Sequence, residues 1–369
     1  ATLNPVNPWA GKPRLNILLL GGDNGAGRDL DLGIRTDTIM VASIDTTTGN
    51  TVIIQVPRNM ARTPFPAGSP LAQAYPRGFY DGSNPDDAEY FANAIWDNVP
   101  REHPELFQNT DYPGADALKL GIGAALGLNI DYFVLVNIDG ISQLVDAMGG
   151  VTVNVNFPVA KGGHVGGVGT EACGVDGYVA EGPNQHLNGT DAMWYARSRC
   201  NDPNQNDYGR MQRQSCLVNA IIGQANPQTM LTRFEGIANS ASQMLLTDIP
   251  KESLDPIVQL AWKVKDASVS RIVFIHGMDG YYTNDPNFNM MRARVASAVV
   301  ASSQQPSAAS TPAAASQPPA APAPATGAPT DPRPAPPAAD NQPAAGPSSA
   351  PAENVTDACA YQHQEPTRG

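Results

Sequence analysis

The chain has 369 residues and a formal net charge of -12. This charge argues against nucleic acid as the main partner, because proteins that bind a phosphate backbone are usually basic overall. The sequence has no apolar run of about 18 residues, so it predicts no membrane span. It begins with alanine and lacks a signal-peptide pattern, so we expect either a processed protein or one whose N-terminal segment was removed.

Strands are predicted first in the N-terminal part of the chain. Residues 14–20 (RLNILLL) form a continuous apolar run, which is typical of a buried strand. Residues 38–44 and 51–56 form two more such runs, and the turn-rich sequence DTTTGN between them predicts a hairpin. Residues 60–113 are rich in proline, glycine and aromatic residues, and they predict a long excursion with one helix near 86–98.

Helices and strands alternate through the rest of the first 300 residues. The periodicity of apolar residues and the glycines at segment ends predict helices at 115–126, 141–148, 207–225, 228–246, 253–264 and 287–301. The remaining strands are expected at 132–138, 151–156 and 271–276, with a short strand or extended segment at 193–199. This order predicts an α/β fold of layered α-β-α type around a central mixed β-sheet.

The C-terminal part has a different composition. Residues 302–351 are almost entirely Ala, Pro, Ser, Gly and Gln, which predicts a disordered tail because little apolar area is available for burial. We therefore expect a catalytic domain at 1–300, an Ala/Pro-rich disordered linker at 301–357 and a short segment at 358–369 that is too small to fold alone.

Four cysteines, Cys173, Cys200, Cys216 and Cys359, fit no zinc-binding spacing. An even number favours disulfides in an oxidising compartment, with free buried thiols as the alternative. Three pairings are open, and we favour Cys173 with Cys216 and Cys200 with Cys359.

Candidate functional residues follow the first two strands. Asp23 lies after the first strand and Asp37 precedes the second, so both carboxylates can meet at one edge of the sheet. Two carboxylates at one site favour Mg²⁺, which often bridges to substrate phosphates. The alternative is a turn residue and a strand cap. Arg58 follows the third strand, where it could bind phosphate or form a surface ion pair.

A cluster of arginines lies further along the chain. In an extended segment Arg197 and Arg199 would point to the same side. On the following helix Arg210, Arg213 and Gln214 share one face by their spacing. Such a cluster in an acidic protein could bind a diphosphate, and a solvated basic face is the alternative. The sequence has no phosphate-binding P-loop and no Gly-x-Ser-x-Gly nucleophile motif, and its histidines show no ligand spacing.

Together these motifs resemble the LytR-CpsA-Psr family of cell-wall glycopolymer transferases. The resemblance rests on LLLGGD, RTDT, VPRN, HLNGTDAMWYARSR and DYGRMQRQ in this order, and it covers roughly residues 14 to 225. It departs from the family at Asn59, where the family usually has aspartate. The cysteines and the tail resemble the actinobacterial branch.

The resemblance implies a phosphotransferase of the cell envelope. Such an enzyme takes a glycan phosphate from a polyprenyl-diphosphate carrier, whose lipid lies in an apolar tunnel, and attaches it to a muramic acid hydroxyl of peptidoglycan. The actinobacterial likeness implies arabinogalactan as the glycan. The family also implies an extracytoplasmic domain held by an N-terminal membrane anchor that this chain does not include.

The resemblance also implies roles for residues. Asp23 and Asp37 would bind Mg²⁺, or alternatively Mn²⁺, and one of them would activate the acceptor hydroxyl. The catalytic set adds Arg58, Arg197 and Arg199. The diphosphate would be bound by Arg35, Arg58, Arg197, Arg199, Arg210, Arg213 and Gln214. Two other functions fit the same residues: a polyprenyl-diphosphate pyrophosphatase, and a non-enzymatic lipid-binding or cell-wall-binding module.

Overall fold

The architecture is a three-layer α/β fold, seen in a computed structural model that describes residues 9, 11–22, 36–84, 86–162, 176–198, 200, 207–228, 245–305 and 352–364. A seven-stranded mixed sheet forms the middle layer, in the order β11-β10-β3-β2-β1-β4-β9. Its strands are β1 (Arg14–Gly22), β2 (Thr36–Asp45), β3 (Thr51–Val56), β4 (Tyr132–Asn137), β9 (Leu245–Thr247), β10 (Val269–Val273) and β11 (Glu353–Asn354). The predicted fold class is confirmed.

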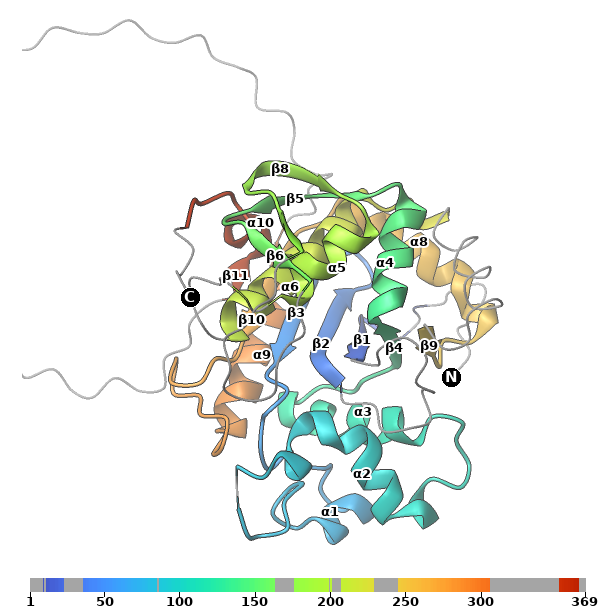
Figure 1. Ribbon diagram of the computed structural model, residues 1–369. Coiled ribbons are helices and arrows are strands. Elements are labelled where there is room, and N and C mark those ends of the chain that lie inside the picture. Colours follow the sequence, from blue (N-terminus) through green and yellow to red (C-terminus); the bar gives the residue numbers. More distant parts are fainter. Residues whose placement is uncertain are drawn as a thin grey trace, which may run out of the picture.

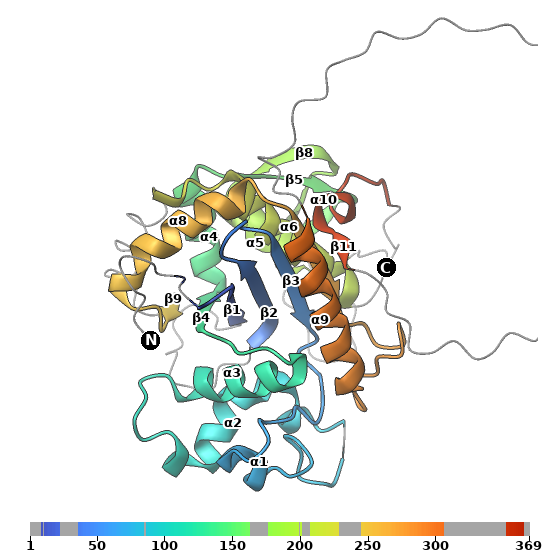
Figure 2. The ribbon, with the colours of Figure 1, turned by 180° about the vertical axis from the view of Figure 1, so that it is seen from behind.

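Helices cover both faces of this sheet (Figures 1 and 2). One side carries α1 (Pro70–Ala74), α2 (Ile95–Glu102) and α3 (Pro113–Leu126), and α9 (Phe288–Gln304) packs against the same apolar cluster. The other side carries α4 (Ile138–Met148), α5 (Gly189–Arg197), α6 (Asp207–Gln224) and α8 (Leu254–Lys265). Two small two-stranded sheets pair β5 (Val151–Val155) with β8 (Gly182–Leu187) and β6 (Val159–Lys161) with β7 (Gly177–Val179).

The central strands are largely apolar because both of their faces are covered. Leu18 and Leu20 of β1 pack into the cluster with α2, α3 and α9. Leu15 and Ile17 point to the opposite face and pack with α6 and α8. A strand buried on both faces reads as a continuous hydrophobic run, which is why the sequence predicted β1, β2 and β3 correctly.

The β2–β3 hairpin closes through side-chain contacts at Asp45. Its carboxylate accepts hydrogen bonds from the backbone N–H groups of Thr47 and Thr48, both at 3.0 Å, and from the Ser303 hydroxyl of α9 at 2.9 Å. Burial alone would raise the pKa of Asp45, but these hydrogen bonds outweigh it and hold the pKa below the ordinary range. The carboxylate therefore joins the hairpin to α9.

The segment at 193–199 was predicted to be extended, and this prediction is wrong. Residues up to Arg197 form α5, whose N-cap Asn188 accepts a hydrogen bond from the backbone N–H of Asp191 at 2.8 Å. An N-cap followed three residues later by an acidic residue is a helix-start signal that the sequence contains. The predicted strand at 271–276 ends at Val273, and the predicted helix at 228–246 includes residues 245 and 246, which belong to β9.

Residues 352–364, which were predicted as the end of a disordered linker and the start of a segment too small to fold alone, pack on the domain. Glu353 and Asn354 form β11, and α10 (Val355–Ala358) follows it. Val355 is buried in the cluster that includes β1 and α8. The predicted linker 301–357 thus starts within α9 and ends in ordered structure. Among the described residues, no helix is long and apolar enough to cross a membrane.

Candidate functional site

A pocket of about 320 Å³ opens where β2 begins, β3 ends and α6 crosses the sheet. Its walls come from four segments that are distant in sequence: residues 37–39, residues 55–59, α6, and the loop that follows β10. The residues that line it include Asp37, Thr38, Gln55, Arg58, Asn59, Tyr208, Arg210, Met211, Gln214, His276 and Thr283.

Asp37 and Arg58 form an ion pair at one wall. Arg58 Nη1 donates to Asp37 Oδ1 at 2.8 Å, and the two side chains are 31% and 24% exposed. The antiparallel register of β2 and β3 pairs Ile39 with Val56, so residues just before Ile39 and just after Val56 meet at the same sheet edge. The β2–β3 register therefore places Asp37 and Arg58 side by side at the sheet edge where the pocket opens.

Helix α6 brings Tyr208, Arg210, Met211 and Gln214 to the opposite wall. It is held to the sheet by Gln55 of β3, whose side-chain amide donates to the carbonyl of Met211 at 2.8 Å and accepts from the Ser215 hydroxyl at 2.6 Å. Gln55 and Ser215 are both buried. A buried polar link of this kind fixes the height of the helix above the strand ends.

Arg213, expected in the same group, points elsewhere. Its Nε donates to the carbonyl of Tyr195 at 2.7 Å, its Nη2 donates to the carbonyl of Ser198, and its guanidinium lies over the Phe157 ring at 5.4 Å. The side chain does not line the pocket, and its hydrogen bonds satisfy the carboxyl end of α5. The helical spacing predicted a shared face, but the contact with α5 determines where this guanidinium lies.

Arg197 lies at the end of α5, exposed and with its guanidinium 5.8 Å from the centre of the Trp194 ring. It does not line the pocket either. The expected extended conformation is wrong at Arg197, because α5 runs to this residue. The expected alignment of Arg197 with Arg199 involves a residue outside the described part of the chain. Asp23, Arg35, Arg199 and Cys173 lie outside the described residues.

Tyr195 of α5 is buried, and this burial perturbs its phenol. The burial raises the pKa of this phenol to about 12, although the nearby Arg213 guanidinium lowers it in part. The hydroxyl donates to the carbonyl of Asn154 at 3.1 Å. Tyr195 is therefore a neutral structural donor across the physiological pH range, and it fixes α5 to β5.

Two pocket residues were not predicted from the sequence. The histidines showed no ligand spacing, so His276 was not a candidate, and Tyr208 appeared only within the motif DYGRMQRQ. His276 Nδ1 accepts a hydrogen bond from the backbone N–H of Thr283 at 3.2 Å and contacts the Thr283 hydroxyl at 2.9 Å. The accepting Nδ1 leaves the ring proton on Nε2 in the neutral imidazole. The sequence signal that could have identified His276 is its position just after a strand, which it shares with Arg58.

The described part of the pocket contains one carboxylate. Asp37 is the only acidic residue lining it, and no group of three or more His, Cys, Asp or Glu among the described residues could hold a metal ion by itself. Mg²⁺ is commonly bound by one or two carboxylates together with substrate phosphates and water. Asp37 fits such a partial ligand set.

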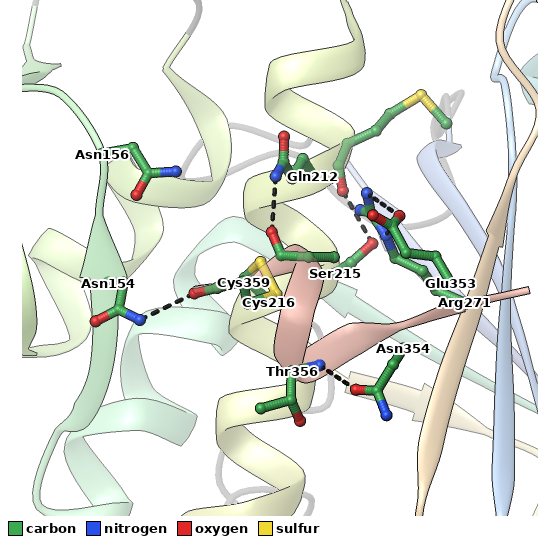
Figure 3. The surroundings of a disulfide bond; sticks show 12 residues. Asn154, Asn156, Gln212, Ser215, Cys216, Arg271, Glu353, Asn354, Thr356 and Cys359 are labelled. Carbon is green, nitrogen blue, oxygen red and sulfur yellow. Dashed lines mark hydrogen bonds and ion pairs between the residues drawn. A yellow bond between two sulfur atoms is a disulfide. The ribbon is translucent and has the colours of Figure 1, made fainter. Parts of the chain in front are cut away.

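The predicted disulfide pairing is wrong. Cys216 of α6 is bonded to Cys359, 143 residues further along the chain, and not to Cys173 (Figure 3). Cys200 is also disulfide-bonded. Its partner is not Cys359, because Cys359 is bonded to Cys216. The pairing depends on where the last segment of the chain docks, which no local pattern encodes.

Comparison with known proteins identifies the family to which the chain belongs. It matches the model of the LytR_cpsA_psr family over residues 3–297, and it therefore belongs to this family. It is 26% identical over 248 residues to the polyisoprenyl-teichoic acid–peptidoglycan teichoic acid transferase TagU of Oceanobacillus iheyensis, covering 67% of this chain and 62% of that protein. The TagU of Bacillus subtilis is 26% identical over 223 residues, covering 60% and 56% respectively. The chain thus spans less than two thirds of the length of either relative.

Solved structures agree on the fold. The crystal structure of B. subtilis TagV has a TM-score of 0.50 at 21% identity, covering 77% of this chain and 96% of that one. Protein gbs0355 of Streptococcus agalactiae has a TM-score of 0.51 at 22% identity, covering 72% and 78% respectively. At this level of identity the likeness shows a shared fold.

Proposed function

We propose that this protein is a phosphotransferase that moves a glycan phosphate from a polyprenyl-diphosphate carrier to a hydroxyl group of peptidoglycan. The observation that carries the proposal is the meeting of Asp37, Arg58, Arg210 and Gln214 in one pocket. Guanidinium and amide donors beside a carboxylate are suited to bind and stabilise a transferring phosphoryl group. Family membership and the transferase activity for which the TagU relatives are named support the same reaction.

The reaction breaks one phosphorus–oxygen bond and forms another. An acceptor hydroxyl oxygen attacks the phosphorus that carries the glycan, and the bond from this phosphorus to the lipid phosphate breaks. The products are a phosphodiester on peptidoglycan and a polyprenyl monophosphate, and a carboxylate takes the hydroxyl proton. We assign Arg58, Arg210 and Gln214 to the diphosphate oxygens and Asp37 to the metal ion or to the hydroxyl proton.

Mg²⁺, or alternatively Mn²⁺, is part of the proposal. Two arginines and one carboxylate leave the described pocket with one net positive charge, which is less than a diphosphate requires. A divalent cation held by Asp37 would supply the remaining charge and draw electron density from the phosphoryl oxygens. Asp23 is proposed as the second ligand, and Arg35 and Arg199 as further phosphate ligands. Arg197 and Arg213 keep their proposed phosphate role only if substrate binding moves them.

The cell envelope is the proposed location, with the chain on the outer side of the membrane and an anchor preceding it. The relatives are named for teichoic acid. We propose arabinogalactan for this chain because its cysteines and Ala/Pro-rich tail resemble the actinobacterial branch. An assay with both kinds of carrier-linked glycan, compared at equal concentration, decides between them.

The test is a transfer assay with Mg²⁺, a polyprenyl-diphosphate glycan and peptidoglycan fragments, with both products followed by mass spectrometry. We expect the linked glycan and polyprenyl monophosphate to appear in equal amounts. Arg58→Ala should abolish transfer. Arg101→Ala is the matched control, because Arg101 is 60% exposed and pairs only with neighbours on and near α2.

Three results would contradict the proposal. Release of free glycan phosphate with no linked product would make the protein a pyrophosphatase. Tight binding of the carrier without turnover, with either metal ion, would make it a binding module. Full transfer by Arg58→Ala would remove the pocket as the site.

A further inference from the structure

Two buried polar side chains, Gln55 and Ser215, join the central sheet to α6 at the edge of the pocket. The Gln55 amide donates to the carbonyl of Met211 at 2.8 Å, and the Ser215 hydroxyl donates to the Gln55 side-chain oxygen at 2.6 Å. Gln55 is 2% exposed and Ser215 is 1% exposed, so both contacts are shielded from water. The amide of Gln55 is therefore bonded to one helix through its oxygen and through its nitrogen.

Apolar side chains surround position 55 of the sheet. Alternate residues of a strand face opposite sides, so Gln55 shares a side with Ile53, which packs in the apolar cluster that includes residues of α6 and α8. The register partners of Gln55 in β2 and β10 are Met40 and Val273, and both are apolar. A glutamine thus occupies a position where the strand pattern favours an apolar residue, and its amide needs hydrogen-bonding partners there.

The same exception occurs on the facing side of α6. Ser215, Val218 and Ile222 are separated by three and four residues, so they form one stripe along the helix. Val218 and Ile222 pack against the apolar cluster of the sheet. Ser215 lies at the other end of the stripe, one turn after Met211, which lines the pocket. The polar pair therefore lies where the apolar contact between sheet and helix ends and the pocket begins.

The pair contributes direction more than stability. A buried hydrogen bond adds little net stability, because both partners give up hydrogen bonds with water, and replacing both partners by apolar groups of similar shape can be nearly neutral. A hydrogen bond does depend steeply on its length and angle, and a fully satisfied buried network specifies one arrangement of the elements that it joins. The two hydrogen bonds of Gln55 therefore specify the height and rotation of α6.

The helix placed in this way carries Arg210 and Gln214, two of the proposed phosphate ligands. Each of them is followed directly in the sequence by a residue that Gln55 contacts. Gln55 itself precedes Arg58 by three residues, on the segment that forms the facing wall. A small rotation of α6 would change the distance between Arg210 and Arg58, which is the distance that a bound diphosphate must span.

We propose that Gln55 and Ser215 are positioning residues that hold α6 in place for substrate binding. Their hydrogen bonds fix the height and rotation at which Arg210 and Gln214 reach a diphosphate that Arg58 also binds. Both residues act through α6 and not by contact with the substrate. The inference deepens the proposed function and rests on it, because it requires a diphosphate in this pocket.

The test compares stability with binding in Gln55→Met, Ser215→Ala and the double variant of the full chain. Thermal melting measures stability, and isothermal titration calorimetry with geranylgeranyl diphosphate and Mg²⁺ measures binding. Ser215→Ala alone should lower the melting temperature by several degrees, because it leaves the buried Gln55 oxygen without its donor. The double variant should melt close to the wild type, because both positions are then apolar. It should still bind the diphosphate about tenfold more weakly, the usual effect of misplacing a hydrogen bond that involves a charged group.

Asn50→Leu is the matched control. Asn50 is buried at the opposite end of β3, and its side-chain amide donates to the carbonyls of Ser302 and Gln305 at the end of α9, both at 3.0 Å. The change therefore removes buried hydrogen bonds between a strand end and a helix, but Asn50 does not line the pocket. This variant should melt at a lower temperature and keep the dissociation constant of the wild type.

The remaining results are equally decisive. A double variant that recovers both stability and affinity would refute the positioning role. Affinity that falls with stability in Asn50→Leu as it does in the pair would also refute it, since the pair would then act only through the fold. If the double variant melts low while Asn50→Leu of similar stability binds normally, the weaker binding belongs to the pair and supports the role. A wild-type protein that does not bind the probe would refute the proposed function itself, and the inference with it.

Discussion

Removing the Cys216–Cys359 disulfide by changing both residues to serine should lower the free energy of unfolding by up to about 5 kcal/mol. The magnitude follows from the sequence separation of 143 between the two cysteines, because a crosslink over so long a loop removes much of the entropy of the unfolded chain. Cys216 is 7% exposed, so the serine hydroxyl placed there adds a further penalty for burying a polar group.

Urea denaturation followed by circular dichroism measures the effect. The same pair changed to alanine is the control, since it removes the crosslink without burying a hydroxyl. If the bond acts through the unfolded chain, the variants should also show a steeper dependence on urea, because the uncrosslinked chain exposes more surface. A loss below about 1 kcal/mol in both variants would refute the reasoning, since it falls below the usual range for a native disulfide. Reduction of the wild type is no substitute, because Cys200 is disulfide-bonded too.

Three further predictions concern the pocket and the hairpin. Arg58→Lys should lower kcat/KM for transfer by about tenfold to a hundredfold, because lysine keeps the charge but loses the planar, bidentate donor set; unchanged kinetics would contradict this. Asn59→Asp adds a second carboxylate to the pocket wall and should tighten Mn²⁺ binding severalfold in electron paramagnetic resonance titrations, with Asp37→Asn moving it the opposite way. The pKa of Asp45 is lowered in the folded protein, so near the ordinary carboxyl pKa of about 3.9 the folded protein binds fewer protons than the unfolded chain. The Asp45 carboxylate therefore stabilises the fold above that pH, and this stabilisation is lost as the pH falls below it. Asp45→Asn should therefore flatten the acid side of a plot of urea midpoint against pH, and an unchanged slope would count against it.

The sequence predicted the central sheet because the signal there is local and strong. Residues 51–56 are entirely buried in β3, and a short apolar run flanked by turn residues has few other interpretations. The pairing of Asp37 with Arg58 was within reach for the same reason, since both residues adjoin strands whose hairpin connection was evident. Strand ends thus gave the most dependable information about the site.

The rest of the site depends on contacts between distant segments. Arg213 lies outside the pocket because its guanidinium donates hydrogen bonds to two carbonyl groups at the end of α5. The sequence predicted the end of α5 to be extended, so this contact was not foreseen. Cys216 pairs with Cys359 because the last segment docks beside β10, far from α6 in sequence. Tyr208 likewise contacts Arg271, which is 63 residues away in the sequence. Helical spacing identifies which residues share a face, but it does not identify what that face meets.

The arginines near the pocket show why overall charge is a poor guide to binding. The chain is acidic, yet each of these guanidinium groups is placed by a different protein partner: Arg58 by Asp37, Arg213 by carbonyl oxygens, and Arg271 by Glu353. A buried arginine whose charge is already paired with a carboxylate or several carbonyls helps to hold the fold in place. An arginine that lines the pocket instead attracts an anionic ligand by its electrostatic field. Arg213 and Arg271 therefore belong to the framework that holds α5, α6 and the C-terminal segment together. Arg58 lines the pocket where a phosphate would bind. Because Arg58 is paired with Asp37, a bound phosphate would compete with the Asp37 carboxylate for the Arg58 guanidinium.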